Sequence, residues 1–349
     1  MNSVPNFQED TASHVLSMSW PSSRAKGNGR PLKRMTVAIA TILLALSGHD
    51  ALSQTSANIK IIVPSSAGGG ADAMSRLLAE HISRSHDQTL VVENRPGAGN
   101  TIGTEFVSRS APDGNTLLIV TPEFVINAHL RKLNYDPLTN FEPICYLARS
   151  PQLIVVNSTS PYRTLGDLFD AARAKPNELT LASAGPASGA HIAFEALKRE
   201  ANVNITFVPY PGSPPAVNAL LGGHLTSVFA SFSNVAELVR SGTLRALATA
   251  SLTRIEEMPN VPTVAEMGFK DFEADIWYGL VAPAKTPSVT IAQRAAWFKE
   301  ALENPDIKQK LGAQGQFPVT KCGAEFNVFI RKQHETFGRA IHDANIKIQ

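Results

Sequence analysis

The sequence predicts an α/β fold built from parallel β-α-β units. Three short apolar runs, at residues 59–63, 88–94 and 116–121, are separated by segments with helical patterning. Strands that alternate with helices at this spacing are typical of parallel sheets. The chain has 349 residues and is 43% hydrophobic, which is enough for one large domain or two medium ones with their own cores.

The N-terminal segment, residues 1–53, has the features of a signal peptide with an upstream extension. Basic residues precede an apolar run at 35–46, which is shorter than the about 20 residues that span a bilayer. Ala51 and Ser53 then supply the small residues that a signal peptidase reads. We expect cleavage near Ser53 and export to the periplasm, with a retained N-terminal anchor as the alternative.

Composition argues against several classes of function. The formal net charge is +2 and the chain has no stripe of Lys and Arg with interleaved aromatic residues, so we expect no nucleic-acid partner. The nine histidines form neither an H-E-x-x-H motif nor a cluster with cysteine, so we expect no metal site. Cys145 and Cys322 allow at most one disulfide, and we favour two ordinary buried thiols.

The first strand, at 59–63, runs into a loop of small residues that contains three consecutive glycines, Gly68 to Gly70. Glycines let the backbone turn sharply and let a ligand approach closely. A helical pattern follows, and the free N–H groups at a helix start suit an anion. Ser65, Ser66 and Asp72 add hydrogen-bonding groups or a helix cap. The stretch predicts a ligand pocket at the end of a strand, and a glycine-rich turn without a ligand is the alternative.

A second glycine-rich stretch, at 97–103, imitates a dinucleotide-binding motif. Its spacing is G-x-G-x-x-x-G, and Arg95 and Pro96 separate it from the preceding strand. The spacing and position are wrong for that motif, so we expect a turn that opens a helix and no cofactor.

The next elements repeat the order of the opening stretch, in which a strand, a loop of small residues and a helix follow one another. Residues 136–143 form a turn-rich link, and a helix at 165–174 follows a strand at 153–157. A strand at 179–182 then runs into a loop of small residues at 183–191, and another helix begins there. We expect this loop and the first one to face each other across a cleft.

The remainder of the chain continues the alternation and ends in a helical region. We expect Trp277 to be core and Tyr278 to line a pocket. The expected strands are 204–210, 226–230, 244–250 and 276–283, and the expected helices are 216–221, 233–240 and most of 288–349.

Ser188 and His191 suggest a nucleophile and its base, which makes a hydrolase the alternative function. The surrounding residues do not form the G-x-S-x-G elbow on which such a serine sits. At the start of a helix, the two side chains can instead bind an anion or cap the helix. We therefore expect no catalysis.

Several motifs in the same order and spacing resemble one family, the periplasmic receptors of tripartite tricarboxylate transporters, often called Bug receptors. The resemblance covers nearly all of residues 58–345, and the family's opening motif V-P-F-x-x-G-G-x-x-D stands here as Val63 to Asp72. The matching motifs are 63–72, 91–99, 112–118, 135–137, 183–191, 208–212, 220–223, 244–248, 261–263 and 277–283.

The resemblance implies a type II periplasmic-binding-protein fold, with two α/β lobes joined by a two-strand hinge and a ligand closed between them. We expect lobe 1 to comprise 58–156 plus 252–349, and lobe 2 to comprise 157–251. The function implied is a monomeric solute-binding protein that captures a small organic acid and delivers it to membrane permease subunits. A ligand sensor for a membrane signalling kinase is a further alternative. The expected ligand-binding residues are Ser65, Ser66, Gly69, Gly70, Asp72, Ser183, Gly185, Ser188, His191 and Tyr210.

The chain departs from the family's pattern at a few positions near the expected ligand. Ser65 replaces a usual Phe, and Ala67 a usual Pro. Ala187 replaces a usual Gly, Pro186 a usual polar residue, and Pro211 a usual Lys. A Phe at position 65 would flank the ligand, so its absence implies a roomier or more polar pocket.

Overall fold

The computed structural model describes residues 21–22, 58–185, 187–210 and 212–347. The described residues from 58 to 347 belong to one compact unit, which contains all the helices and strands discussed below. The predicted signal peptide and its cleavage site near Ser53 lie outside the described residues. In the described part, no helix combines the length and apolarity that crossing a bilayer requires.

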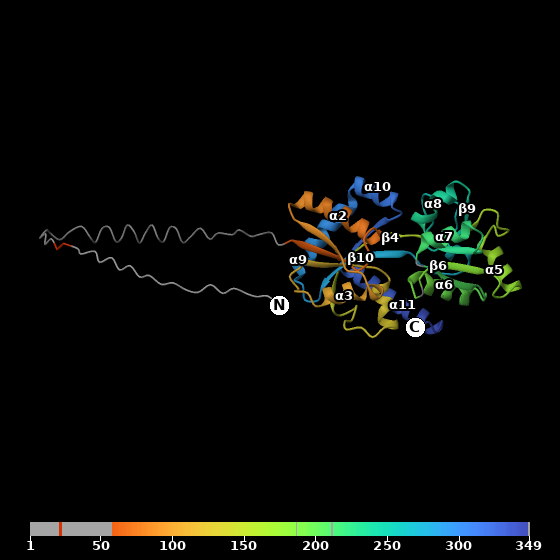
Figure 1. The fold of residues 1–349 in the computed structure, drawn as a ribbon, viewed down its shortest axis with the longest axis horizontal. Coiled ribbons are helices and arrows are strands. Elements are labelled where there is room, and N and C mark those ends of the chain that lie inside the picture. Colours follow the sequence, from red (N-terminus) through yellow and green to blue (C-terminus); the bar gives the residue numbers. More distant parts are fainter. Residues whose placement is uncertain (1–20, 23–57, 186, 211, 348–349) are drawn as a thin grey trace, which may run out of the picture. The chain divides into compact units, whose positions relative to one another are not determined.

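The first of two β-sheets in the fold is a six-stranded mixed sheet (Figure 1). Its order is β11-β4-β10-β3-β1-β2, and β1 lies parallel to both β2 and β3, as the β-α-β spacing predicts. The other pairs are antiparallel. The strands are β1 (Ile59–Val63), β2 (Leu90–Asn94), β3 (Thr116–Val120), β4 (Phe141–Ser150), β10 (Ile276–Pro283) and β11 (Phe317–Cys322).

Helices cover both faces of this sheet because successive strand residues point to opposite sides. Ile61 of β1 packs in one core with Met74 and Phe298, whereas the adjacent Ile62 packs in another with Phe124 and Phe326. The first face carries α2 (Gly70–His86), α9 (Ser288–Glu303) and α10 (Pro305–Ala313), and the second carries the 3-10 turn η1 (Ala98–Asn100), α3 (Thr101–Ser108), α4 (Glu123–Leu130) and α11 (Ala324–Asp343).

A five-stranded sheet, in the order β7-β6-β8-β5-β9, has the same layered construction. Its two cores lie on opposite faces, with Ile154 of β5 on one side and Leu153 and Val155 on the other. The elements are β5 (Gln152–Asn157), α5 (Leu165–Ala174), β6 (Thr180–Ala184), α6 (Gly189–Glu200), β7 (Thr206–Tyr210), α7 (Ser213–Leu221), β8 (Ser227–Ser231), α8 (Phe232–Arg240), β9 (Leu244–Thr249) and the 3-10 turn η2 (Ala265–Met267).

The chain passes between the two sheets twice. It crosses first at Pro151, between β4 and β5, and returns through residues 250–275, between β9 and β10. The sequence placed the whole of 58–156 in the first lobe, yet β5 pairs with β8 and β9 of the five-stranded sheet. The change of sheet therefore falls at Pro151.

Two strands differ from the sequence-based expectation. The region 136–143 was expected to be a link, but β4 begins at Phe141 and carries Pro143 within it. The C-terminal region was expected to be mostly helical, but β11 adds an edge strand between α10 and α11.

Cys145 and Cys322 form a disulfide, which corrects the expectation of two separate thiols. The two residues lie opposite each other where β4 and β11 pair, although 177 positions separate them in the sequence. Because β11 was not predicted, nothing in the sequence brought the two cysteines together.

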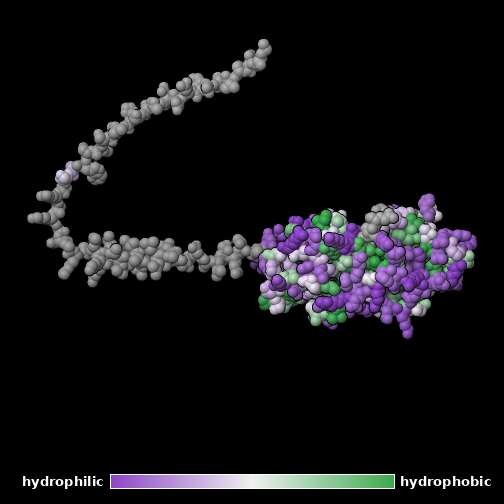
Figure 2. All heavy atoms as spheres, turned by 90° about the horizontal axis from the view of Figure 1, so that it is seen from below, coloured by the Kyte–Doolittle hydropathy of each residue, from purple (hydrophilic) through white to green (hydrophobic). Residues whose placement is uncertain are grey.

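The face of the molecule shown in Figure 2 is mostly hydrophilic, with small separate hydrophobic areas. Large exposed apolar side chains among the described residues lie on different elements. They are Val91 on β2, Ile102 on α3, Leu252 after β9, Val289 on α9 and Val328 on α11. Apolar residues scattered in this way are normal on a protein surface and do not by themselves indicate a docking site.

Candidate functional site

A cavity of about 90 Å³ lies where the two sheets meet. Helix starts from both sides border it: Glu123 at the start of α4, Gly189 at the start of α6 and Ser213 at the start of α7. Helices α4 and α7 begin without a side-chain cap. At the α4 start, the Phe124 N–H already donates to the Thr121 carbonyl at 2.9 Å, and of the first three α7 residues Ser213 alone has an N–H, because prolines follow it. Converging helix N-termini favour a negatively charged group.

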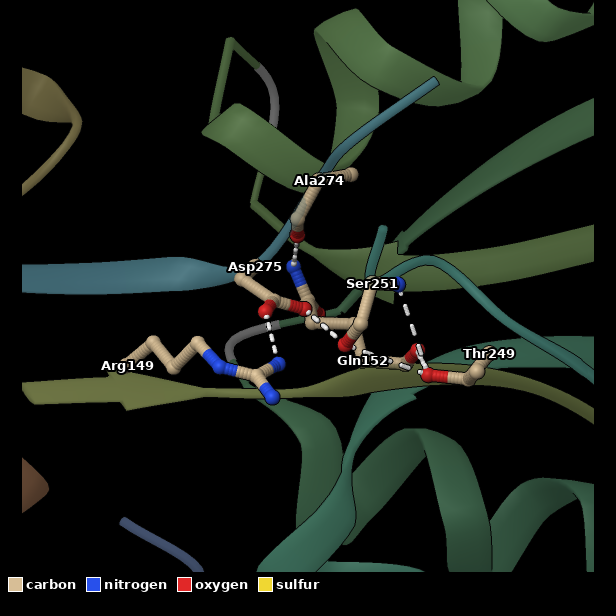
Figure 3. A network of polar contacts seen from close by, with 6 residues as sticks. All are labelled: Arg149, Gln152, Thr249, Ser251, Ala274 and Asp275. Atoms are coloured by element: carbon tan, nitrogen blue, oxygen red, sulfur yellow. Dashed lines mark hydrogen bonds and ion pairs between the residues drawn. The ribbon is translucent and has the colours of Figure 1, made fainter. Parts of the chain in front are cut away.

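The two crossings of the chain form another wall, and a polar network joins them (Figure 3). Asp275, just before β10, accepts from Arg149 at 2.7 Å and from the Ser251 hydroxyl at 2.6 Å. Gln152 of β5 donates to the Ala274 carbonyl at 3.0 Å. The network thus links the end of β4, the start of β5 and the segment that leads into β10, and it compensates the charge of Asp275.

Two further carboxyl groups line the cavity. Glu123 accepts a hydrogen bond from the Thr121 hydroxyl at 2.6 Å. Glu273 is partly buried, and burial together with the negative charge of Asp275 raises the pKa of Glu273. Within residues 58–185, 187–210 and 212–347, neither glutamate forms an ion pair, in contrast to Asp275.

Aromatic side chains form the apolar part of the wall. Trp277 is 2% exposed, and its ring meets Phe329 edge-on at 5.5 Å between centroids. Phe329 stacks on Tyr146 at 4.4 Å. The Trp277 Nε1–H is buried and has no hydrogen-bond partner among the described residues. Such a donor costs free energy unless a bound group accepts from it.

Direct contacts join the elements of the two sheets. Gly189, which lines the cavity, packs so closely that a Cβ there would lie 3.3 Å from Cβ of Pro122. Phe232 of α8 meets Phe317 of β11 edge-on, with 5.7 Å between ring centroids. Such contacts are what an arrangement closed over a ligand requires.

Of the ten residues expected to bind the ligand, Ser188 is the one that lines this cavity. Its hydroxyl accepts from the backbone N–H of His191 at 3.2 Å and caps α6. The His191 ring turns elsewhere: Nδ1 accepts from the Ala187 N–H at 3.0 Å, and the ring stacks on Phe207 at 3.9 Å. Burial lowers the pKa of His191. The ring is therefore engaged with its own loop, which disfavours its use as a base for Ser188.

Ser183, Gly185 and Tyr210 cluster near the end of the β6–β7 pair. Gly185 donates its N–H to the Tyr210 carbonyl at 2.8 Å. Ser183 is fully buried, and its hydroxyl has no hydrogen-bond partner among the described residues. Pro186 and Pro211, two of the departures from the family pattern, lie outside those residues.

The loop after β1 satisfies its own polar groups. Asp72 accepts from the Gly68 N–H at 2.9 Å and pairs with Arg76, also at 2.9 Å. Asn94 donates to the Ser65 carbonyl at 3.1 Å. Burial raises the pKa of Asp72, but the bonds from Arg76 and Gly68 outweigh it and hold that pKa below its ordinary value.

The other expected residues of this loop lie away from the cavity lining. Ser66 and Gly69 are exposed, and a Cβ on Gly70 would lie 2.8 Å from the Tyr278 hydroxyl. Tyr278 itself belongs to the core on the α2 face of the sheet.

Sequence reasoning missed several residues of the cavity wall, among them Glu123, Gln152 and Glu273. The signal available was weak, because a glutamate next to a strand is common on any surface. Trp277 was expected to be core, and it does lie in the core on the α11 face, where it also borders the cavity. Tyr278 was expected to line a pocket, but it lies in the core on the α2 face. Their alternation along β10 places them on opposite faces.

Comparisons with known proteins agree with this architecture. Residues 74–346 match the family model described as tripartite tricarboxylate transporter family receptor. Protein BugT of Bordetella pertussis is 33% identical over 294 residues, which cover 83% of this chain and 90% of that protein. The chain spans most of its relatives' length, so the resemblance concerns the whole protein.

Solved structures show the same fold. The periplasmic binding protein BugD is 30% identical with a TM-score of 0.70, over 84% of this chain and 99% of that one. A Rhodopseudomonas palustris protein with bound malate is 27% identical with a TM-score of 0.69, over 81% and 98%. Another R. palustris protein, with adipate, is 28% identical with a TM-score of 0.73, over 84% and 99%.

These findings confirm the predicted α/β fold of the periplasmic binding proteins, with its two sheets. The matched family is one of solute receptors and not of enzymes, in agreement with the expectation of no catalysis. The chain belongs to the family of tripartite tricarboxylate transporter receptors, the periplasmic solute-binding proteins that include the Bug proteins.

Proposed function

We propose that this protein captures a small organic acid between its two lobes in the periplasm and delivers it to the permease subunits of a tripartite tricarboxylate-type transporter. One lobe is the six-stranded sheet with its helices, and the other is the five-stranded sheet. Pro151 and residues 250–275 act as the hinge. The mature protein is a monomer released by cleavage near Ser53.

The observation that carries the proposal is the convergence of helix starts from both sheets on one cavity. The α6 and α7 starts belong to one sheet, and the α4 start, which carries Glu123, belongs to the other. A small organic acid with its carboxylate at the α6 and α7 starts would reach both lobes at once, so it would favour the closed state over the open one. The malate and adipate bound by two structural relatives support a carboxylate ligand.

Among the proposed ligand contacts, Ser188 and the N–H groups at the α6 start have the most direct support. The β1–α2 loop, with Ser65, Ser66, Gly69, Gly70 and Asp72, belongs to the same proposal as the facing side of the cleft. Ser183, Gly185, His191 and Tyr210 complete it on the lobe that carries Ser188.

A thermal-shift screen of the mature protein tests the function. The screen covers dicarboxylates, tricarboxylates, aromatic acids and acid amides. A ligand present at about 100 times its Kd should add about 2.7 kcal/mol to the free energy of unfolding. If none of these acids raises the unfolding temperature, the proposal is wrong.

A further inference from the structure

The cavity presents different chemistry at its two sides. The α6 and α7 starts, with Ser188 and Ser213, face it from the five-stranded sheet. Glu123, from the six-stranded sheet, and Glu273, from the returning crossing, face the same space. One side therefore offers N–H donors, and the other offers carboxylate acceptors.

Two of the three carboxylates around the cavity keep free acceptor capacity. Asp275 is the third, and both of its oxygens already accept hydrogen bonds, one from Arg149 and one from the Ser251 hydroxyl. Glu273 makes no hydrogen bond or ion pair within the described part of the chain, although the positive charges of Lys332, Arg149 and Lys321 favour its ionised form. Glu123 accepts only the hydroxyl of Thr121 there. A carboxylate has room for about four acceptor contacts, so both glutamates retain capacity for a ligand.

A ligand with a carboxylate at each end fits this arrangement poorly. One carboxylate would meet the helix starts, but the other would lie beside Glu123 and Glu273. Like charges brought together in a partly desolvated site repel each other. An ammonium or amide group in the same place would donate to the glutamates instead.

We propose, on the basis of the function above, that the ligand is a dipolar acid: a carboxylate for the α6 and α7 starts, joined to an amino or primary amide group that donates to Glu273 and Glu123. The unpartnered Nε1–H of Trp277, buried in the same wall, supplies a donor for a ligand oxygen. Such a ligand differs from the adipate and malate bound by two structural relatives.

A competing account makes both glutamates structural. Glu123 is the first residue of α4, where an acid stabilises the helix N-terminus. Glu273 has a raised pKa, and in its neutral form it would not repel a second carboxylate. Under that account, a dicarboxylate binds as well as a dipolar acid of the same length.

Matched probes separate the two accounts by calorimetric titration of the wild-type mature protein. One series is succinate, succinamate and 4-aminobutanoate, and the other is adipate, adipamate and 6-aminohexanoate. In at least one series we expect the amino or amide acid to bind about tenfold more tightly than the dicarboxylate, or more, as one charge-assisted hydrogen bond predicts. Equal or tighter binding of the dicarboxylate in both series overturns the inference and leaves the proposed function standing. Absence of binding by all six, together with a screen without any shift, contradicts both.

Isosteric variants test whether the two glutamates bind the amino or amide group. Glu273→Gln and Glu123→Gln should each weaken binding of the dipolar acid about tenfold and reduce the difference in affinity between the dipolar acid and the dicarboxylate. Glu303→Gln removes an exposed carboxylate on α9 and serves as the control, with unchanged binding. If both cavity variants behave like Glu303→Gln, the inference fails. The wild-type comparison decides the question even if one variant does not fold.

Discussion

At the scale of single residues, a side chain of the cavity wall can also have a role in the fold. Ser188 shows this, because its hydroxyl caps α6 while the residue lines the cavity. Asp72 also has a role in the fold, since its carboxylate organises the loop after β1 through Gly68 and Arg76.

Replacement of Ser188 by Ala should lower both stability and ligand affinity. Loss of the cap costs about 1 kcal/mol of unfolding free energy, and the loosened α6 start should bind an acid several-fold more weakly. Thr164→Ala is the matched control, because Thr164 caps α5 in a capping box and does not line the cavity. Thr164→Ala should lower the free energy of unfolding by a similar amount in denaturant titrations and leave the affinity for the acid unchanged. Equal affinity of the two variants would remove Ser188 from the ligand site.

Asp72 should make stability depend on pH in the acid range. Its pKa is lower in the folded state than the ordinary 3.8. The folded state therefore binds a proton less readily than the unfolded chain does, so the contribution of Asp72 is fully present above that value and is lost as pH falls through the folded pKa.

Asp72→Asn should thus cost about 1 kcal/mol near pH 7, and the gap to the wild type should close on acidification below pH 3.8. Urea unfolding at a series of pH values measures this gap. A gap that stays constant down to pH 2 would show that the lost contacts do not depend on the charge.

At the scale of elements, sequence patterns predicted the repeated β-α-β units. They missed strands whose partners lie far away in the sequence. The parallel pairs β1–β2 and β1–β3 follow from apolar runs separated by helices. Strand β4 was missed because Pro143 interrupts its pattern, and β11 because its half-exposed residues carry little apolar signal. Both pair antiparallel, and no local pattern identifies a partner so far away in the chain.

The disulfide fixes this distant pairing in a covalent bond. Reduction, or the double variant Cys145→Ala with Cys322→Ala, should lower the free energy of unfolding by about 2–5 kcal/mol. Ligand affinity at low temperature should stay unchanged, because Cys145 packs on the core beneath α2 and α9, away from the cavity. Thermal unfolding with and without reductant measures the effect, and the double variant, which should not respond to reductant, is the control. An equal unfolding temperature for all samples would contradict a stabilising bridge.

At the scale of the whole molecule, the sequence predicted two facing loops, of which the loop at Ser188 borders the cavity and the loop after β1 does not. The loop at Ser188 was identified from its small residues before a helix, whereas Glu123 and Glu273 reach the same cavity only because two sheets meet there. Contacts between the elements of the two sheets include Gly189 against Pro122 and Phe232 against Phe317.

A large side chain at Gly189 should hold the two sheets apart. Gly189→Leu places bulk where even a Cβ would lie 3.3 Å from Pro122, so we expect about tenfold weaker binding and a larger radius of gyration with ligand present. Gly312→Leu in α10 is the control, since nothing lies within 4 Å of a Cβ there. Small-angle X-ray scattering with titration compares the two. If the two variants have the same ligand affinity and the same radius of gyration, closure of the two lobes does not involve the contact between Gly189 and Pro122.

Trp277 gives the molecule a built-in optical reporter. The chain has three tryptophans, and cleavage near Ser53 would leave two, Trp277 in the cavity wall and Trp297 stacked on His86. An indole in such a position emits according to the polarity and hydrogen bonding around its Nε1–H, which a bound ligand replaces or supplies. Intrinsic emission of a Trp297→Phe variant would then follow occupancy of the cavity directly, without a label, while the chain is free to open and close.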